Sequence, residues 1–224
     1  MSSLEDRILE LDFIGNQAKL MLALVSSRRK NSGGLGFLEN ETGNADEIKE
    51  FCKGEKLDIY SYFTDNQLIR SSDGSEQRYK HIFLWHEKSV LDNNFKSFLN
   101  AGRPRQGNKK VKDFREELEE YNYKCGIMYG YPECCSKRFS EIYLFTKEVP
   151  TFLFEVLRLH EKRKPIDDLI ATLYVPCSVN CEKTLDAGNG KFLKRDFPRI
   201  FRSYKRNLLK QIRKYRDNVV VNYS

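Results

Sequence analysis

The sequence has no long apolar run, only three histidines, and no internal repeat or low-complexity tract. None of its apolar stretches approaches the roughly 20 residues that a membrane-spanning helix needs. The first residues, Met1 to Asp6, lack the basic segment and apolar core of a secretory signal. We therefore expect a cytoplasmic protein that does not insert into a membrane.

Disulfides are not the first expectation for the six cysteines. In a reducing cytosol, clustered cysteines more often ligate a metal or carry out redox chemistry. Intracellular proteins of some hyperthermophiles are an exception, so structural disulfides remain an alternative.

The positive charge is concentrated at one end of the chain. Residues 191–224 hold eleven Lys or Arg and two Asp, a net charge of +9, whereas the whole chain carries +7. The other 190 residues therefore sum to −2. A partner attracted by positive charge would meet the C-terminal segment.

Hydrophobic periodicity and turn residues predict an α+β protein. We expect two parts, residues 1–110 with an N-terminal helix and a small α/β lobe, and residues 111–224 with a mainly helical lobe that carries the cysteines. Helices are expected over 3–25, 44–53, 88–100, 111–123, 136–147, 150–162 and 196–216, and strands over 35–38, 57–63 and 80–86. Residues 101–112 are expected to form a basic linker.

Five cysteines fall in two segments framed by Gly or Pro, at 125–135 and 176–181. Gly126, Gly130 and Pro132 predict a loop-like backbone before Cys134 and Cys135, with a helix starting at Cys135 or Ser136. Thiols at a helix N-terminus feel the positive end of the helix dipole, which lowers their pKa and favours thiolate.

The second segment has a Cys-x3-Cys spacing that brings both thiols to one side. The candidate ligands are Cys134, Cys135, Cys177, Cys181 and Cys125. Thiolates suit Zn²⁺ or iron–sulfur clusters, not Mg²⁺ or Ca²⁺. Only Cys177/Cys181 fits the usual zinc spacing, and a larger cluster tolerates the adjacent pair better. The choice between an iron–sulfur cluster and Zn stays open.

These two segments resemble a known pair of motifs. Gly130-Tyr131-Pro132-Glu133-Cys134-Cys135, followed by Phe139, and Pro176-Cys177-Ser178-Val179-Asn180-Cys181 look like the signature of a mostly archaeal domain-of-unknown-function family, number 483. The resemblance extends over residues 30–190. It implies that the four cysteines of the motifs act as one group, and it supplies no substrate. Cys125 lies outside the shared motifs, and Cys52 lies in the other lobe.

Other polar residues have simpler interpretations. His81 and His86 are expected on opposite faces of a strand and so do not form a joint metal site. His160, late on a helix, and Glu133, beside Cys134, are secondary candidates for the cysteine site. Gly33, Gly34 and Gly36 lack the strand-before-helix context of a phosphate loop and are interpreted as a turn.

The last predicted helix carries two stripes. An apolar one should pack on the protein: Phe197, Ile200 or Phe201, Tyr204, Leu208, Ile212 and Tyr215. A basic one follows a neighbouring face: Arg199, Arg202, Arg206, Lys210 and Arg213. A basic stripe suits the phosphates of RNA or DNA, although it can equally be a solvated face.

Three hypotheses follow. The first is a metal or iron–sulfur protein, with action on nucleic acid as an enzyme left open. The second is a non-catalytic nucleic-acid-binding module stapled by zinc. The third is a metal-free thiol redox protein that uses the adjacent cysteines. The sequence does not determine whether the protein is catalytic or what its oligomeric state is.

Overall fold

The chain divides into two compact units. One contains Val25–Gly130, here the sheet unit, and the other contains Met1–Leu24 and Tyr131–Ser224, here the cysteine unit. The computed structural model describes residues 2–38, 42–70, 76–85, 97–99, 104, 107–142, 148–174 and 176–221. The boundary expected at residue 110 stays a prediction.

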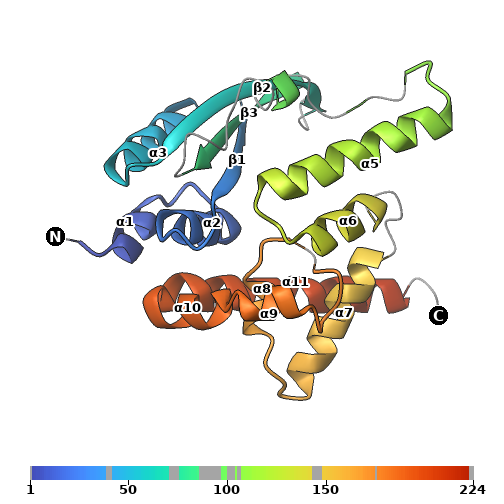
Figure 1. Ribbon diagram of the computed structural model, residues 1–224. Helices are drawn as coiled ribbons and strands as arrows, with labels where there is room; N and C mark the ends of the chain where they lie inside the picture. Colours follow the sequence, from blue (N-terminus) through green and yellow to red (C-terminus); the bar gives the residue numbers. More distant parts are fainter. Residues whose placement is uncertain are drawn as a thin grey trace. The chain divides into compact units, whose positions relative to one another are not determined.

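The sheet unit contains a three-stranded antiparallel sheet (Figure 1). Its elements, in chain order, are β1 (Ser32–Leu38), α3 (Thr42–Gly54), β2 (Asp58–Arg70) and β3 (Glu76–Trp85). The spatial order is β1-β3-β2, so β3 pairs with both other strands. Trp85 is the partner of Ser32 on one side and of Asp58 on the other. With helices in the other unit, this sheet confirms the α+β class.

The helix α3 packs on β1 and β2. It buries Ala45, Ile48 and Cys52, which recur at intervals of three and four residues and therefore lie on one helix face. The remaining face is polar and holds ion pairs such as Lys49–Asp46. Cys52 is a core residue of this unit.

A second part of the sheet unit's core joins the end of β3 to α5 (Val111–Met128). Phe83, Trp85, Leu99 and Met128 are buried together. Tyr129 packs against them, with its ring centroid 5.6 Å from that of Phe83. The Ser32 hydroxyl donates to the carbonyl of Met128 at 2.6 Å, which ties the start of β1 to the end of α5.

The expectation of a turn at Gly33-Gly34 is wrong, because both residues lie in β1. A Cβ on Gly34 would stand 2.8 Å from the hydroxyl oxygen of Tyr129. An aromatic side chain therefore approaches the backbone of β1 closely at Gly34, and a larger residue there would require that ring to shift. Local composition alone favoured a turn, because that ring comes from a distant part of the sequence.

The cysteine unit is helical among its described residues. Its helices are α1 (Leu4–Glu10), most of α2 (Asn16–Ser26), α6 (Glu133–Ile142), α7 (Glu148–Glu161), α8 (Asp167–Ile170), α9 (Glu182–Asp186), α10 (Asn189–Asp196) and α11 (Pro198–Val221). The long α11 contacts α1, α7 and α10, and α8 contacts α9 and α10. No described helix is long and apolar enough to cross a membrane.

Two expected helix boundaries are wrong. The helix expected over 3–25 is two helices, because residues 11–15 form a turn in which the amide of Asp12 donates to the carbonyl of Glu10. Its start is confirmed, since Ser3 and Asp6 form a capping box. The loop expected around Gly126 is also wrong, because α5 continues through Cys125 to Met128.

The end of α5 depends on Gly130 rather than Gly126. Gly130 has a φ of +70°, a conformation that glycine adopts without steric cost. Its amide donates to the carbonyl of Ile127 at 2.9 Å and so closes the helix. A single Gly inside a helix costs only about 1 kcal/mol, and α5 accommodates Gly126 at one of its few buried positions.

Candidate metal centre

Cys134 and Cys135 lie in the first turn of α6. The helix starts at Glu133, earlier than expected, because the carbonyl of Pro132 accepts the amides of Cys135 and Ser136, each at 2.9 Å. Proline before a helix start supplies this acceptor without needing a donor of its own. The two thiols are thus held by a fixed backbone, with their sulfur atoms 3.9 Å apart.

Cys177 and Cys181 lie in an irregular turn that leads into α9. The amide of Cys181 donates to the carbonyl of Ser178 at 3.2 Å, and the carbonyl of Cys181 accepts the amides of Thr184 and Leu185. Cys181 is therefore the cap of α9. The expected convergence of the Cys-x3-Cys thiols occurs in a turn before the helix, not on it.

The four thiols converge on one point. The Sγ atoms of Cys134, Cys135, Cys177 and Cys181 all lie within 4.8 Å of one another. Three of the separations are 3.9 Å, 4.0 Å and 3.6 Å, for the pairs 134/135, 134/181 and 135/181. Four thiolates around one tetrahedral ion, at a metal–sulfur distance of about 2.3 Å, stand about 3.8 Å apart. The donor set and its spacing therefore fit a metal ion.

The four thiols differ in exposure. Cys135 and Cys181 are buried, Cys177 is half-buried and Cys134 is exposed. Sulfur atoms at these separations repel one another once they carry negative charge, so a cation among them would favour the thiolate forms.

Burial opposes thiolate formation at Cys135 and Cys177. It raises the pKa of Cys135 far above its usual value, although hydrogen bonds from the Cys177 amide and Thr184 act in the opposite direction. It also raises the pKa of Cys177 to about 11. The lowered pKa expected for Cys135 at a helix N-terminus is therefore wrong, because desolvation outweighs the helix end.

Cys181 has the lowered pKa instead. Burial acts to raise it, but hydrogen bonds from the side chain and backbone of Thr184 and from neighbouring thiols lower the pKa to about 7. The acidified thiol is the one at the start of α9. The sequence thus predicted a thiol of lowered pKa at the start of a helix, but it placed that thiol in α6 rather than before α9.

Two residues that the sequence did not single out support the sulfur cluster. The Thr184 hydroxyl lies 3.7 Å from Cys135 Sγ and 3.1 Å from the Tyr174 hydroxyl. The Tyr174 ring in turn stacks on Tyr131, with centroids 4.5 Å apart. Such outer contacts hold ligands in position at metal sites. The Tyr131 of the first motif was the only sequence signal for them.

The remaining candidates are not part of the cluster found among the described residues. The cluster of His, Cys and carboxylate groups found among the described residues contains neither His160 nor Glu133. Cys125 lies in α5 and in the sheet unit, and burial raises its pKa to about 11. Its membership of the centre stays a prediction. The side chains of His81 and His86 lie outside the described residues.

The basic stripe lies on α11, the helix expected near residues 196–216. Its five members are exposed. Of the expected apolar stripe, Phe197, Ile200, Phe201 and Ile212 are buried, Tyr204 and Leu208 are half-buried, and Tyr215 is 49% exposed. The stripe is thus confirmed at its buried members and wrong at Tyr215, which contacts Phe154.

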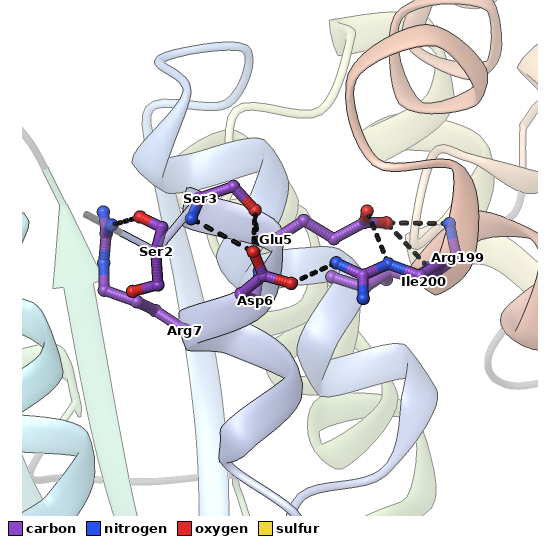
Figure 2. A network of polar contacts seen from close by, with 7 residues as sticks. All are labelled: Ser2, Ser3, Glu5, Asp6, Arg7, Arg199 and Ile200. Carbon is purple, nitrogen blue, oxygen red and sulfur yellow. Dashed lines mark hydrogen bonds and ion pairs between the residues drawn. The ribbon is translucent and has the colours of Figure 1, made fainter.

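Arg199 differs from the other four basic residues (Figure 2). Its guanidinium donates to Glu5 at 3.0 Å and also pairs with Asp6. The second oxygen of Glu5 accepts the backbone amides of Arg199 and Ile200 at 2.7 and 3.1 Å. The Glu5 carboxylate thus caps the start of α11 and pairs with Arg199. Hydrogen bonds from Ser3, and then from Arg199, lower the pKa of Asp6 to about 2.

Arg202, Arg206, Lys210 and Arg213 are the unengaged part of the stripe. None of them pairs with an acidic group among the described residues. In contrast, Lys205 is bound to Asp167 and Arg216 to Glu161. Within the described part of the chain, the cations on the stripe beyond Arg199 therefore have no compensating negative charge.

Fold and centre together define the class: an α+β protein in which four clustered cysteines could hold a metal ion. Residues 106–208 match the model of the family described as "Protein of unknown function (DUF483)". The matched segment contains all four cysteines and supports the resemblance to this family, but it begins at residue 106 rather than at residue 30. Searches of curated proteins and of solved structures gave no significant match.

Proposed function

We propose that the protein binds a single metal ion through Cys134, Cys135, Cys177 and Cys181, and that this ion is Zn²⁺. The observation that carries the proposal is the spacing of the sulfur atoms, 3.6–4.0 Å for three pairs. This equals the edge of a tetrahedron of thiolates around one zinc ion, about 3.8 Å.

An iron–sulfur cluster is less well supported by the same spacing. Each cysteine of a [4Fe–4S] cluster ligates a different iron, so its thiolates stand further apart than four thiolates on one ion. All four sulfur atoms here lie within 4.8 Å. In the sequence, the adjacent Cys134 and Cys135 favoured an iron–sulfur cluster over zinc. In the structure, their sulfur atoms are 3.9 Å apart in the first turn of α6, a separation that suits two ligands of one ion.

The proposed role of the ion is structural. Four protein thiolates fill a tetrahedral zinc site and leave no position for water or substrate, whereas catalytic zinc sites keep one open. The ion would link the start of α6 to the turn before α9. Both α8 and α9 are only four and five residues long, and helices of that length are not stable alone.

Metal analysis of anaerobically purified protein tests this proposal. We expect one zinc per chain, and after exchange with Co²⁺ an absorption spectrum of tetrahedral cobalt with four thiolates. Cys181→Ser should lose this spectrum, and Cys125→Ser is the matched control that should keep it. Iron with acid-labile sulfide would replace the zinc assignment with a cluster. Metal-free protein with a Cys134–Cys135 disulfide would instead support the thiol redox hypothesis.

A second function, binding of RNA or DNA, is favoured by a separate observation. Arg202, Arg206, Lys210 and Arg213 are exposed at intervals of three and four residues, and no acidic group among the described residues neutralises them. A helix rises about 6 Å over four residues, so the stripe presents regularly spaced cations. Phosphate backbones bind such cations with release of counterions. In this role the zinc ion would stabilise the fold of a non-catalytic nucleic-acid-binding module.

Binding of single- and double-stranded RNA and DNA oligonucleotides across a salt series tests the second function. Each phosphate contact contributes about 0.7–0.9 to the slope of log K against log salt. Arg202→Gln and Arg206→Gln should each lower affinity and reduce that slope. Arg216→Gln is the matched control, because Arg216 is held by Glu161. Equal effects of all three substitutions, or binding without salt dependence, would contradict the proposal.

A further inference from the structure

The four thiols of the centre are unequal in their access to solvent. Cys134 is exposed, whereas Cys135 and Cys181 are buried with 1% and 6% of their surfaces accessible. Cys177 is half-buried. A molecule approaching from solvent therefore reaches Cys134 first.

The thiols are also unequal in their hydrogen bonds. Cys135 Sγ accepts the backbone amide of Cys177 at 3.5 Å and lies 3.7 Å from the Thr184 hydroxyl. Cys181 also receives hydrogen bonds from Thr184. The contacts of Cys134 Sγ among the described residues are with sulfur atoms, those of Cys135 and Cys181 at 3.9 and 4.0 Å.

Hydrogen bonds from N–H and O–H groups draw charge from a metal-bound thiolate and so weaken it as a nucleophile. The thiolate is the reactive form of cysteine, and metal binding keeps it deprotonated at neutral pH. A centre loaded with metal would therefore hold one accessible thiolate without such hydrogen bonds and two shielded thiolates that have them.

We propose that Cys134 is the reactive thiolate of the loaded centre and that it is a site of alkylation by soft carbon electrophiles. The inference rests on the proposed metal site. A sulfur lone pair of Cys134 forms a bond to carbon, and the bond between that carbon and its leaving group breaks, with the electron pair departing on the leaving group. No proton moves, because a metal-bound thiolate carries none.

Alkylation has a consequence for the ion. The product is a neutral thioether, which binds zinc much more weakly than a thiolate does. Three thiolates would remain, and one coordination position would open to water. Modification of Cys134 thus converts the closed, structural form of the site into an open form from which the ion dissociates more readily.

Iodoacetamide is a suitable probe because it alkylates thiolates with release of iodide. Metal-loaded full-length protein is treated briefly, and each cysteine is quantified by peptide mass spectrometry while metal content is measured on the same sample. We expect Cys134 to react at least about tenfold faster than Cys135 or Cys181, a difference of about 1.4 kcal/mol in activation free energy. Cys177 should rank second.

A positioning test uses Thr184→Val, which keeps the shape of the side chain but removes its hydroxyl. If the hydrogen bond shields Cys135, alkylation of Cys135 should accelerate in this variant while that of Cys134 stays the same. Release of the ion to a chromogenic chelator should also accelerate in the wild-type protein in proportion to the fraction of Cys134 that is alkylated.

The outcomes separate the two proposals. Loaded protein in which Cys177 or Cys135 reacts first, or in which all four thiols react together, would overturn the assignment of Cys134 and leave the metal site in place. Protein that binds no metal would overturn the metal site and this inference with it. Cys52, which is fully buried in the sheet unit, serves as the internal control for unfolding, since its alkylation would reveal a denatured fraction.

Discussion

The sheet unit and the cysteine unit are stabilised in different ways. The sheet unit has an apolar core, in which Phe83 and Trp85 from β3 pack with Leu99 and Met128. The helices around the cysteines also bury apolar side chains, such as Leu157, Ile170 and Ile200, and they are held in addition by particular polar and sulfur contacts. The sulfur cluster joins α6 to the turn before α9, and Glu5 caps α11.

A further polar contact in the cysteine unit joins α8 to α10. The Asp168 carboxylate accepts the amide of Gly190 at 2.8 Å, and a Cβ on Gly190 would lie 2.2 Å from the backbone of Asp167. The two short helices touch backbone to backbone. This difference teaches that a substitution at one of these contacts acts by removing a link, whereas a substitution at Phe83 acts by leaving a cavity.

The largest effect is expected for Cys181→Ser. Cys181 is a proposed ligand and the cap of α9, so its loss should lower metal affinity by more than the roughly 10–100-fold typical of outer-shell substitutions. We expect helical circular dichroism to fall while fluorescence of Trp85, the only tryptophan, stays that of a buried indole. Titration with a chelator measures the affinity. Loss of the buried Trp85 emission would show that the two units do not respond separately.

Phe83→Ala is the converse substitution. Phe83 is 1% exposed, and deleting a buried Phe side chain costs about 3–5 kcal/mol of unfolding free energy. Denaturant titration followed by Trp85 fluorescence should show this loss, with zinc content unchanged. Val111→Ala, at a residue 60% exposed in the same unit, should change stability by less than about 0.5 kcal/mol. If Phe83→Ala releases zinc at low denaturant, then a core substitution in the sheet unit also affects the metal site, and the two units do not respond separately.

A pH dependence should distinguish the sheet unit further. Burial lowers the pKa of Lys30 from 10.5 to about 7. Between these values the unfolded chain binds a proton that the folded chain does not, so the free energy of unfolding should rise with pH by about 1.4 kcal/mol per unit. Below pH 7 Lys30 is charged in both the folded and the unfolded chain, so the free energy of unfolding stays reduced by the full cost of charging this buried side chain.

The variant Lys30→Met should lack this rise, and the difference between its pH curve and that of the wild-type protein isolates Lys30 from other titrating groups. Lys53→Met is the matched control, because Lys53 is exposed on α3. Its curve should run parallel to that of the wild-type protein. Parallel curves for both variants would show that Lys30 does not titrate across this range.

The smallest effect is expected for Glu5→Gln. An amide oxygen can still accept the amides of Arg199 and Ile200, but the negative charge at the start of α11 and beside Arg199 is lost. We expect a decrease of about 1 kcal/mol in unfolding free energy, and a smaller one at high salt. Thermal unfolding at two salt concentrations measures it, with Glu10→Gln as the control on the exposed face of α1. If Glu5→Gln and Glu10→Gln have the same unfolding free energy, the charge of Glu5 does not stabilise the cysteine unit.

Several elements of the fold could be predicted because their signals are local. The capping box at Ser3 and Asp6, the strand that ends at Trp85 and the long basic helix α11 depend on residues within a few positions of one another. The predictions from sequence were wrong where the local structure depends on contacts with residues far away in the sequence. Gly33 and Gly34 resemble a turn by local composition, but they lie in β1, where the Tyr129 side chain approaches Gly34.

The same division holds at the cysteines. From the sequence alone came the grouping of Cys134, Cys135, Cys177 and Cys181 and the concentration of positive charge near the C-terminus, because residue chemistry and short spacing are properties of the chain itself. Only the tertiary structure decided that the four sulfur atoms lie within 4.8 Å of one another, that Cys134 alone among them is exposed, and that Thr184 supports Cys135. It also paired Glu5 with Arg199 across 194 positions. Burial and such contacts arise from packing between distant segments, which local patterns do not record.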